Sequence, residues 1–353
     1  MIDTIVTETI AALLISVPFM VVAVLVNGHR RDVRSARHRA AVVELREQLG
    51  ALLAEDPKGE HAFIGLLSKV DRSVAEHVLH PLMIELSGRA EELLRTAAVH
   101  ANLADGLERR TRSLRWRQRR RAAFLLGLRP DDDGLVTRLL RDRKPVVAHV
   151  AADSIGQATT VAAVVPLIEM LSSNEPHLRF AAQHALIRMR DRATEPLIKH
   201  IETTLKPNDT VWALGVAVHI ASPDFADVAV AIASHPSPKV RSVVARLLGA
   251  IGATDTTEVL VGLLLDNVAE VRVEAIEALG RTGWSAAAPQ LGRSLSDQSF
   301  AVRQAAARAL TRLGAVGELV LRHHTRDEDR FAAEAANSAL ISLTSHREVA
   351  ALA

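Results

Sequence analysis

The 353-residue sequence contains no cysteine and no tyrosine, and aromatic residues make up only 3% of it. The absence of cysteine excludes disulfides, thiolate zinc sites and cysteine nucleophiles. Because aromatic residues are so scarce, the core must be aliphatic and rich in alanine. That composition fits small, close-packed helices better than a sandwich or barrel. Hydrophobic residues still account for 48% of the chain, so a sizeable core can form.

The sequence also lacks the motifs of common catalytic sites. It has no P-loop, no dinucleotide-binding glycine fingerprint and no Gly-x-Ser-x-Gly elbow. His149 and Asp153 share one helix face, and His323 and His324 are adjacent, but neither cluster offers the three or four ligands of a metal site. The run 131–134 lacks calcium-loop spacing and instead predicts an N-cap. We predict no catalytic residue, no metal, no cofactor and no enzymatic activity.

Long hydrophobic runs are absent with one exception, residues 9–28 (TIAALLISVPFMVVAVLVNG). As a helix this run would be roughly 30 Å long, the hydrocarbon thickness of a bilayer. Asp3 and Glu8 precede it and five arginines follow between Arg30 and Arg39, which predicts a cytoplasmic C-terminal side. A cleaved signal peptide or a buried helix fits less well. We therefore expect a transmembrane anchor at 1–28 and a single-pass location in a bacterial inner membrane.

The rest of the chain contains an internal repeat. VRSVVARLLG at 240–249, VRVEAIEALG at 271–280, VRQAAARALT at 302–311 and LRFAAQHALI at 178–187 superpose directly. Looser copies begin near Gln118, Val147, Thr210 and Ala332, so the copies follow one another at a nearly constant spacing. Apolar residues within each copy recur at the spacing of one helix face. A second amphipathic helix lies between copies, so each unit of about 31 residues is a helix pair that must stack on its neighbours.

These segments resemble the short bacterial HEAT-like repeats, the type also seen in phycobilin lyase subunits. The most specific mark is Val-Arg at the start of the second helix with an aspartate six residues before the arginine, as in Asp266 with Arg272 and Asp297 with Arg303. The resemblance implies that such pairs link neighbouring repeats, so we expect a structural ladder rather than a ligand site. Arg241 has no such aspartate. Iron-binding HEAT-like hydroxylases use His-Glu dipeptides, and this chain has none.

Together these patterns predict an all-α fold. We expect an α-solenoid of about eight helix pairs at 109–353, preceded by the anchor at 1–28 and by a juxtamembrane helical cap at 29–108. The cap region reads as helical but does not keep the repeat.

One stretch of the array, residues 108–121, carries eight arginines around a tryptophan. Nothing within the stretch after Glu108 balances this charge, so we predict a binding patch for anionic lipid headgroups of the inner leaflet or for an acidic protein. Nucleic acid is a third alternative, which a membrane anchor disfavours. A solvated outer face of the first repeat is the plainest alternative. The predicted binding residues are Arg109, Arg110, Arg112, Arg115, Trp116, Arg117, Arg119, Arg120 and Arg121.

The function that these features predict is a membrane-anchored cytoplasmic scaffold, which binds membrane-associated protein partners through its solenoid and has no catalytic activity. Two enzymatic alternatives follow from the resemblance. A lyase-like protein would need aromatic residues in its groove, and a DNA-glycosylase-like protein would need a basic groove built from several repeats. The scarcity of aromatic residues and the confinement of excess arginine to one repeat disfavour both.

Overall fold

The computed structural model describes residues 40–45, 47, 49–50, 57–70, 74–75, 78–79, 82, 89–103, 105–126, 132–155 and 160–352. Within these residues every regular element is a helix. The described chain divides into two compact units, with residues up to 126 in unit 1 and residues from 132 onward in unit 2.

Unit 1 consists of short helices, α2 (Pro57–Lys69), α4 (Arg89–His100), α5 (Leu107–Thr111) and α6 (Trp116–Phe124). Helix α2 packs against α4, and α5 packs against α6. Phe63 and Leu94 are completely buried in this unit. Pro57 begins α2, because proline already has helical φ and lacks only an N–H that the first turn leaves unbonded.

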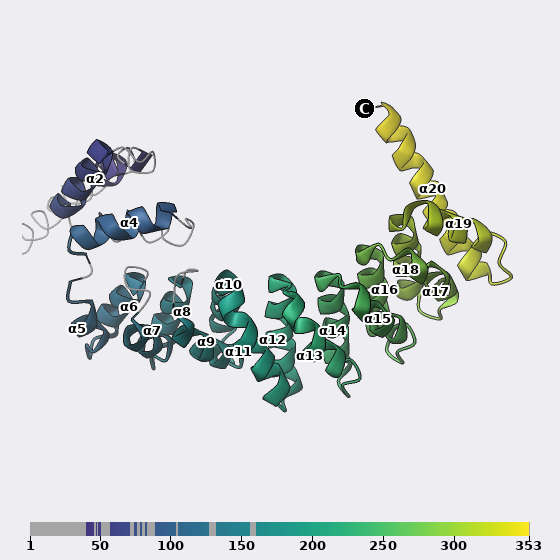
Figure 1. The fold of residues 1–353 in the computed structure, drawn as a ribbon, viewed down its shortest axis with the longest axis horizontal. Helices are drawn as coiled ribbons and strands as arrows, with labels where there is room; N and C mark the ends of the chain where they lie inside the picture. Colours follow the sequence, from purple (N-terminus) through teal and green to yellow (C-terminus); the bar gives the residue numbers. More distant parts are fainter. Residues whose placement is uncertain are drawn as a thin grey trace, which may run out of the picture. The chain divides into compact units, whose positions relative to one another are not determined.

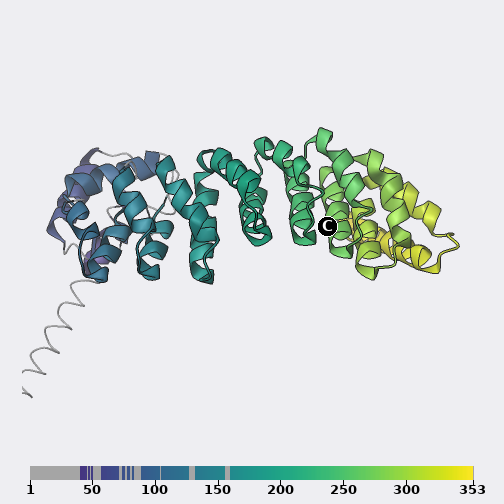
Figure 2. The same cartoon turned by 90° about the horizontal axis from the view of Figure 1, so that it is seen from below.

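Unit 2 is a row of helix pairs that continue to the C-terminal region (Figures 1 and 2). The first helices of the pairs are α7 (Asp133–Leu140), α9 (Val164–Leu171), α11 (Asp191–Thr203), α13 (Ala226–Ala231), α15 (Thr257–Leu263), α17 (Ala288–Arg293) and α19 (Gly314–His324). The second helices are α8 (Pro145–Asp153), α10 (Pro176–Met189), α12 (Pro207–Ile220), α14 (Pro238–Ile251), α16 (Ala269–Thr282), α18 (Phe300–Arg312) and α20 (Arg330–Leu352). Short 3-10 turns precede or extend several first helices. The solenoid part of the predicted fold is therefore confirmed.

The second helices begin in a repeated way. Pro145, Pro176, Pro207 and Pro238 each occupy the first turn of a second helix, where a missing N–H costs nothing. Two residues before the N-cap, a short polar side chain accepts a hydrogen bond from the backbone N–H two residues on. The acceptors are Asp142, Ser173, His235, Asp266, Asp297 and Asp327. This local turn brings each chain segment into its second helix in the same register.

Successive second helices pack directly against one another, and two glycines allow the closest approaches. A Cβ at Gly249 of α14 would lie 2.5 Å from the Cβ of Ala278 in α16, and one at Gly280 would lie 2.9 Å from the Cα of Ala309 in α18. Helices can approach this closely only where one partner has no side chain. The stack from α14 to α18 is therefore tightly closed.

Among the residues that the structure describes, no helix is both long and apolar enough to cross a membrane. The longest of them, α20, has 23 residues but includes Arg330 and Glu334. The transmembrane part of the predicted fold is therefore wrong, as is the predicted single-pass location in a bacterial inner membrane. That prediction used the length and hydropathy of 9–28 and the charges that flank it, and the segment 1–28 lies outside the described residues. Apolar surface gains a similar transfer free energy against protein as in lipid, so hydropathy alone does not establish a span.

Candidate binding surface

An arginine ladder runs along the edge of unit 2 where the second helices begin. The Arg241 guanidinium donates from Nε and Nη2 to the two carboxylate oxygens of Asp266, at 2.6 and 2.8 Å. Arg272 binds Asp297 in the same bidentate way, at 2.7 Å for both bonds. Each of these pairs joins one repeat to the next. The predicted ladder thus links repeats, but through Arg241 with Asp266 rather than through the six-residue spacing.

The six-residue spacing reflects a different bond. Nη1 of Arg272 donates to the backbone carbonyl of Asp266 at 2.8 Å, and Nη1 of Arg303 donates to that of Asp297 at 2.8 Å. Arg179 and Arg241 make the equivalent bond to the carbonyls of Ser173 and His235. One edge of each guanidinium is therefore fixed to its own turn, which leaves Nε and Nη2 to face the next repeat.

The pKa values of both ladder carboxylates are lowered, because of these bonds. The hydrogen bond from Arg241 lowers the pKa of Asp266 below its ordinary value, against the opposing effect of burial. For Asp297, burial raises the pKa, but the bonds from Arg272 and from the Ser299 N–H outweigh it and the net pKa is lowered. Both carboxylates are therefore ionised at neutral pH and pair with charged arginines.

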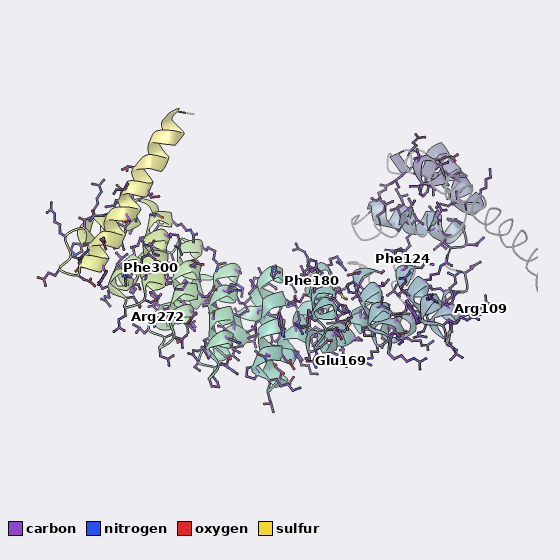
Figure 3. All side chains as sticks on the ribbon, turned by 180° about the vertical axis from the view of Figure 1, so that it is seen from behind. Arg109, Phe124, Glu169, Phe180, Arg272 and Phe300 are labelled. Atoms are coloured by element: carbon purple, nitrogen blue, oxygen red, sulfur yellow. The ribbon has the colours of Figure 1, made fainter. Side chains whose placement is uncertain are left out.

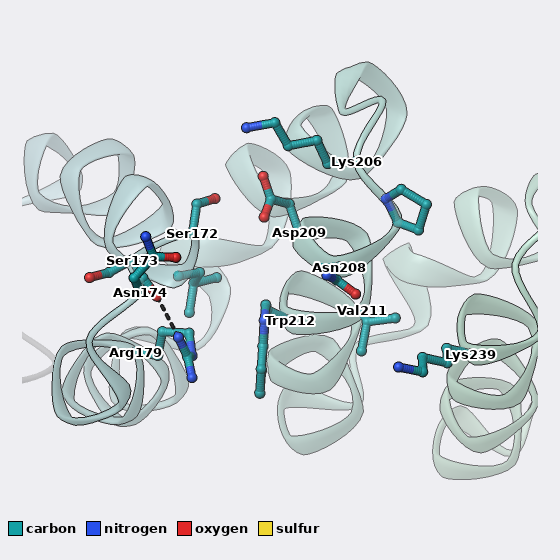
Figure 4. Close-up of a pocket in the computed structure, with 12 residues that line it drawn as sticks. Ser172, Ser173, Asn174, Arg179, Lys206, Asn208, Asp209, Val211, Trp212 and Lys239 are labelled. Carbon is teal, nitrogen blue, oxygen red and sulfur yellow. Dashed lines mark hydrogen bonds between the residues drawn. The ribbon is translucent and has the colours of Figure 1, made fainter.

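Arg179 occupies the same register in α10 but faces no aspartate. Among the described residues no carboxylate lies within ion-pair distance of it, and its guanidinium instead lies 5.0 Å from the centre of the Trp212 ring in α12. A pocket of about 770 Å³ opens here. Figure 4 shows Arg179 and Trp212 beside each other across the gap between their helices. The lining residues are Leu171, Ser172, Ser173, Asn174, Arg179, Lys206, Pro207, Asn208, Asp209, Val211, Trp212 and Lys239.

The pocket is positively charged. Arg179, Lys206 and Lys239 line it together with a single acid, Asp209. Burial lowers the pKa of His200 in α11, with Asp209 opposing the shift, so this imidazole is neutral near pH 7 and does not offset the acid. The second helices α10 and α12 also direct their N-terminal ends toward this edge, where their dipoles favour an anion. The local field therefore attracts negative charge.

The ladder is open at its other end as well. Asp327 stands two residues before the N-cap of α20, but its carboxylate binds Nδ1 of His324 at 2.7 Å. Arg303 lies over two phenylalanine rings instead, 5.7 Å from the centre of Phe300 and 4.8 Å from that of Phe331. The two ladder arginines that lack an aspartate among the described residues, Arg179 and Arg303, therefore stack on aromatic rings.

Three of the seven phenylalanines are exposed along the same edge. Phe180, Phe300 and Phe331 have exposed fractions of 60%, 67% and 56%, and each lies in the first two turns of a second helix. Figure 3 labels Phe180 and Phe300 on the ribbon. We call this edge, the first two turns of the second helices in unit 2 with the turns before them, the turn ridge. The turn ridge combines exposed aromatic rings with two arginines, Arg179 and Arg303, that pair with no aspartate of the described chain.

The arginine cluster predicted from the sequence lies on α5 and α6 of unit 1. Arg109, Arg112, Arg115, Arg117 and Arg120 are exposed, and Arg110, Trp116 and Arg121 are half-buried. Arg112 pairs with Glu108 at 2.7 Å. The guanidinium carbons of Arg117 and Arg120 lie 5.3 and 5.8 Å from the Trp116 ring centre.

Arg119 differs from the rest of the cluster because it is buried. Its Nη1 donates to the carbonyls of Ser113 and Leu114, at 2.8 and 3.2 Å, which is the bond that the ladder arginines make to their own turns. Arg119 therefore contributes to the framework of α5 and α6. For the other cluster residues, binding stays a prediction.

The polar clusters considered for metals have ordinary roles. Nε2 of His149 lies 3.2 Å from the carboxylate of Asp153, and the His149 ring meets the His177 ring edge to face. Asp132 caps α7 by accepting from the Leu135 N–H at 3.0 Å, as the 131–134 run predicts.

Sequence reasoning missed the pocket at Arg179. The arginine was visible in the repeat alignment, but its neighbour Trp212 lies in the next second helix, far along the sequence, and belongs to no motif. A usable signal was present in Thr204, which stands where aligned repeats have aspartate.

Comparison with known proteins identifies the repeat family and shows similar folds. The family model for HEAT repeats matches residues 133–208, 206–279 and 266–341, more than half of the chain. No curated protein matches it. Among solved structures, the karyopherin Kap121p bound to the extreme C-terminus of the phosphatase Cdc14p is 11% identical with a TM-score of 0.50; the match covers 84% of this chain and 41% of Kap121p.

An engineered protein is 20% identical with a TM-score of 0.38, covering 87% of this chain and 95% of its own. Human deoxyhypusine hydroxylase is 19% identical with a TM-score of 0.29, covering 68% and 95%. The likeness to Kap121p concerns the fold alone, and the chain spans about two fifths of that protein. The repeat matches define the relationship: this chain belongs to the family of HEAT-repeat proteins.

Proposed function

We propose that this protein is a non-catalytic scaffold that binds partner proteins through its turn ridge. The observation that carries the proposal is the exposure of Phe180, Phe300 and Phe331 in a chain with so few aromatic residues. Exposed aromatic rings beside arginines are the typical anchors of protein interfaces. HEAT-repeat solenoids are typically protein-interaction scaffolds, and Kap121p, whose fold is similar, binds a protein segment.

Photo-crosslinking tests this proposal. A photoreactive amino acid placed at Phe180, Phe300 or Phe331 should crosslink discrete partner polypeptides in cells. The same amino acid at Glu195 or Glu258, both exposed on first helices, is the matched control. The proposal predicts crosslinks from the ridge positions only, and loss of those at position 300 when Phe180 and Phe331 are replaced by alanine. Equal crosslinking from the control positions would refute a ridge-specific interface.

We propose a second, independent contact at the exposed arginines of α5 and α6. The stacking of Arg117 and Arg120 on Trp116 holds two guanidinium groups side by side, which suits an acidic protein surface. Replacing Arg117 and Arg120 by serine should reduce partner capture and its salt dependence, whereas replacing Arg192 on α11 should not. Unchanged capture by the double variant would show that the cluster is a solvated face.

A further inference from the structure

We propose that the pocket between α10 and α12 binds a carboxylate side chain from an acidic segment of a partner protein. The inference rests on the proposed scaffold function and adds the chemistry of the segment that is recognised. Its support is a comparison within unit 2 between Arg179, which pairs with no aspartate in the part of the chain that the structure describes, and Arg241 and Arg272, which each hold one.

The closed part of the ladder shows which ligand this register binds. Arg241 and Arg272 fix Nη1 on a turn carbonyl and use Nε and Nη2 to hold an aspartate from the next repeat. Arg179 makes the same Nη1 bond to Ser173, so its guanidinium is fixed in the same way. Its Nε and Nη2 edge is therefore preorganised for a planar, bidentate carboxylate that its own chain does not supply.

The backbone at Thr204 matches the backbone at the ladder aspartates. Thr204 follows Arg179 at the same sequence separation as Asp266 and Asp297 follow their own arginines. Like those aspartates, it stands two residues before the N-cap of a second helix. Its φ and ψ of −78° and 133° resemble the −63° and 146° of Asp297. A residue without a carboxylate thus occupies an aspartate's position in the repeat, and the pocket opens beside the arginine that an aspartate there would serve.

The pocket walls select an acidic peptide over other anions. Lys206 and Lys239 add two cations at the rim, and Asp209 is the single acid in the lining. Trp212 provides an aromatic wall against which the stem of a side chain can pack. A phosphate backbone needs a stripe of exposed cations along its length, whereas this pocket concentrates its charge around one recessed guanidinium. The chemistry fits a short segment with one inserted aspartate or glutamate.

Fluorescence anisotropy of the full-length protein with a designed probe tests binding. The probe is a fluorescein-labelled peptide with four aspartates in a glycine, serine and leucine background, and its twin carries asparagine at the four positions. The acidic peptide should bind and the amide twin should not. R179Q should weaken binding at least about tenfold, because a bidentate charge-assisted pair is lost. K239Q should weaken it about twofold, and the matched control K199Q, on the exposed face of α11, should not change it.

A variant that gains stability separates recognition from folding. T204D should supply the missing aspartate, raise the Tm and reduce peptide affinity at least about tenfold by competing within the chain. In the R179Q background the same substitution should give no gain in Tm. D209N should bind the acidic peptide more tightly than the wild type, because it removes the one repulsive charge.

Several results would overturn the inference. These are equal binding of the asparagine twin, no detectable binding of the acidic peptide up to millimolar concentration, or unchanged affinity of R179Q or T204D. A single-stranded oligonucleotide that binds more tightly than the peptide and depends on Arg179 would make nucleic acid the occupant. If ridge crosslinks form in the wild-type protein but the acidic peptide does not bind it, the scaffold function stands and the pocket inference falls. If the acidic peptide binds and its binding depends on Arg179, but no ridge crosslinks form, the pocket inference stands and the proposal of a ridge interface falls.

Discussion

The stack from α14 to α18 and the gap between α10 and α12 are built from the same repeat, but one is closed and the other is open. In the closed stack, Gly249 and Gly280 bring second helices together, and Arg241 and Arg272 hold aspartates across the interfaces. In the open gap, Ile187 stands at the alignment position of Gly249, and Arg179 meets a tryptophan beside a pocket.

The difference shows how a repeat protein can make a site without leaving its fold. Each interface depends on a few residues at fixed repeat positions, because a repeat contacts only its neighbours. Replacing glycine by isoleucine and aspartate by threonine at one interface leaves the helices in place. What is lost there is a structural ion pair, and what is gained is an arginine available to an outside ligand.

The largest effect should come from forcing the closed stack apart. G249V would place a branched side chain where even a Cβ lies 2.5 Å from the Cβ of Ala278, so we expect a loss of about 3 kcal/mol in the free energy of unfolding. Urea denaturation followed by circular dichroism measures this. A278G should recover part of the loss in the double variant. A loss of less than about 0.5 kcal/mol would show that the interface adapts easily.

A smaller effect should follow from opening one ladder pair. In D266N the Arg241 guanidinium, whose side chain is 12% exposed, loses its carboxylate, so we expect a loss of about 2 kcal/mol at pH 7. D255N, on an exposed residue, is the control. Hydrogen exchange should locate the loss in α14 and α16. A uniform loss across unit 2 would contradict the neighbour-limited coupling of the repeats.

Acid should act on the same pair with a defined sign. The pKa of Asp266 is lowered in the folded protein, so the unfolded chain takes up the proton first as the pH falls. The stabilisation is complete above the ordinary aspartate pKa of about 3.9 and is lost as the pH falls through the lower folded value. Denaturation between about pH 6 and about pH 3 should show a shallower acid dependence for D266N than for the wild type. Parallel curves for the two proteins would show that this ion pair does not contribute to acid denaturation.

The repeated helices were predictable because their signals are local. The second helices α8 to α20 contain all the predicted copy starts except Gln118, which lies in α6, since an apolar stripe needs only one helix's own sequence. The prolines at 145, 176, 207 and 238 also mark helix starts at the period of the repeat, a signal that the apolar pattern alone does not use. The prediction of a membrane anchor shows the converse, because the apolarity of a run of residues does not say what that run is buried against.

The site was less predictable because it depends on pairs far apart in sequence. The motif of Asp266 with Arg272 suggested a side-chain pair, but the carboxylate turns to Arg241 of the preceding repeat and Arg272 reaches only the Asp266 carbonyl. Arg119 looked like its exposed neighbours, yet its turn buries it. An alignment of repeats by their N-caps would have shown Thr204 in an aspartate's place.

The smallest expected change in the free energy of unfolding concerns α12, one of the two helices beside the open gap. Gly215 lies inside α12, and a Cβ there would meet nothing within 4 Å, in contrast to Gly249. G215A should therefore stabilise the protein by about 0.5–1 kcal/mol, because alanine loses less backbone entropy in a helix than glycine. G249A, the same chemical change in the closed stack, should destabilise it. If both variants shift urea denaturation in the same direction, the two interfaces do not differ in packing, and the open gap is not a built feature of the repeat.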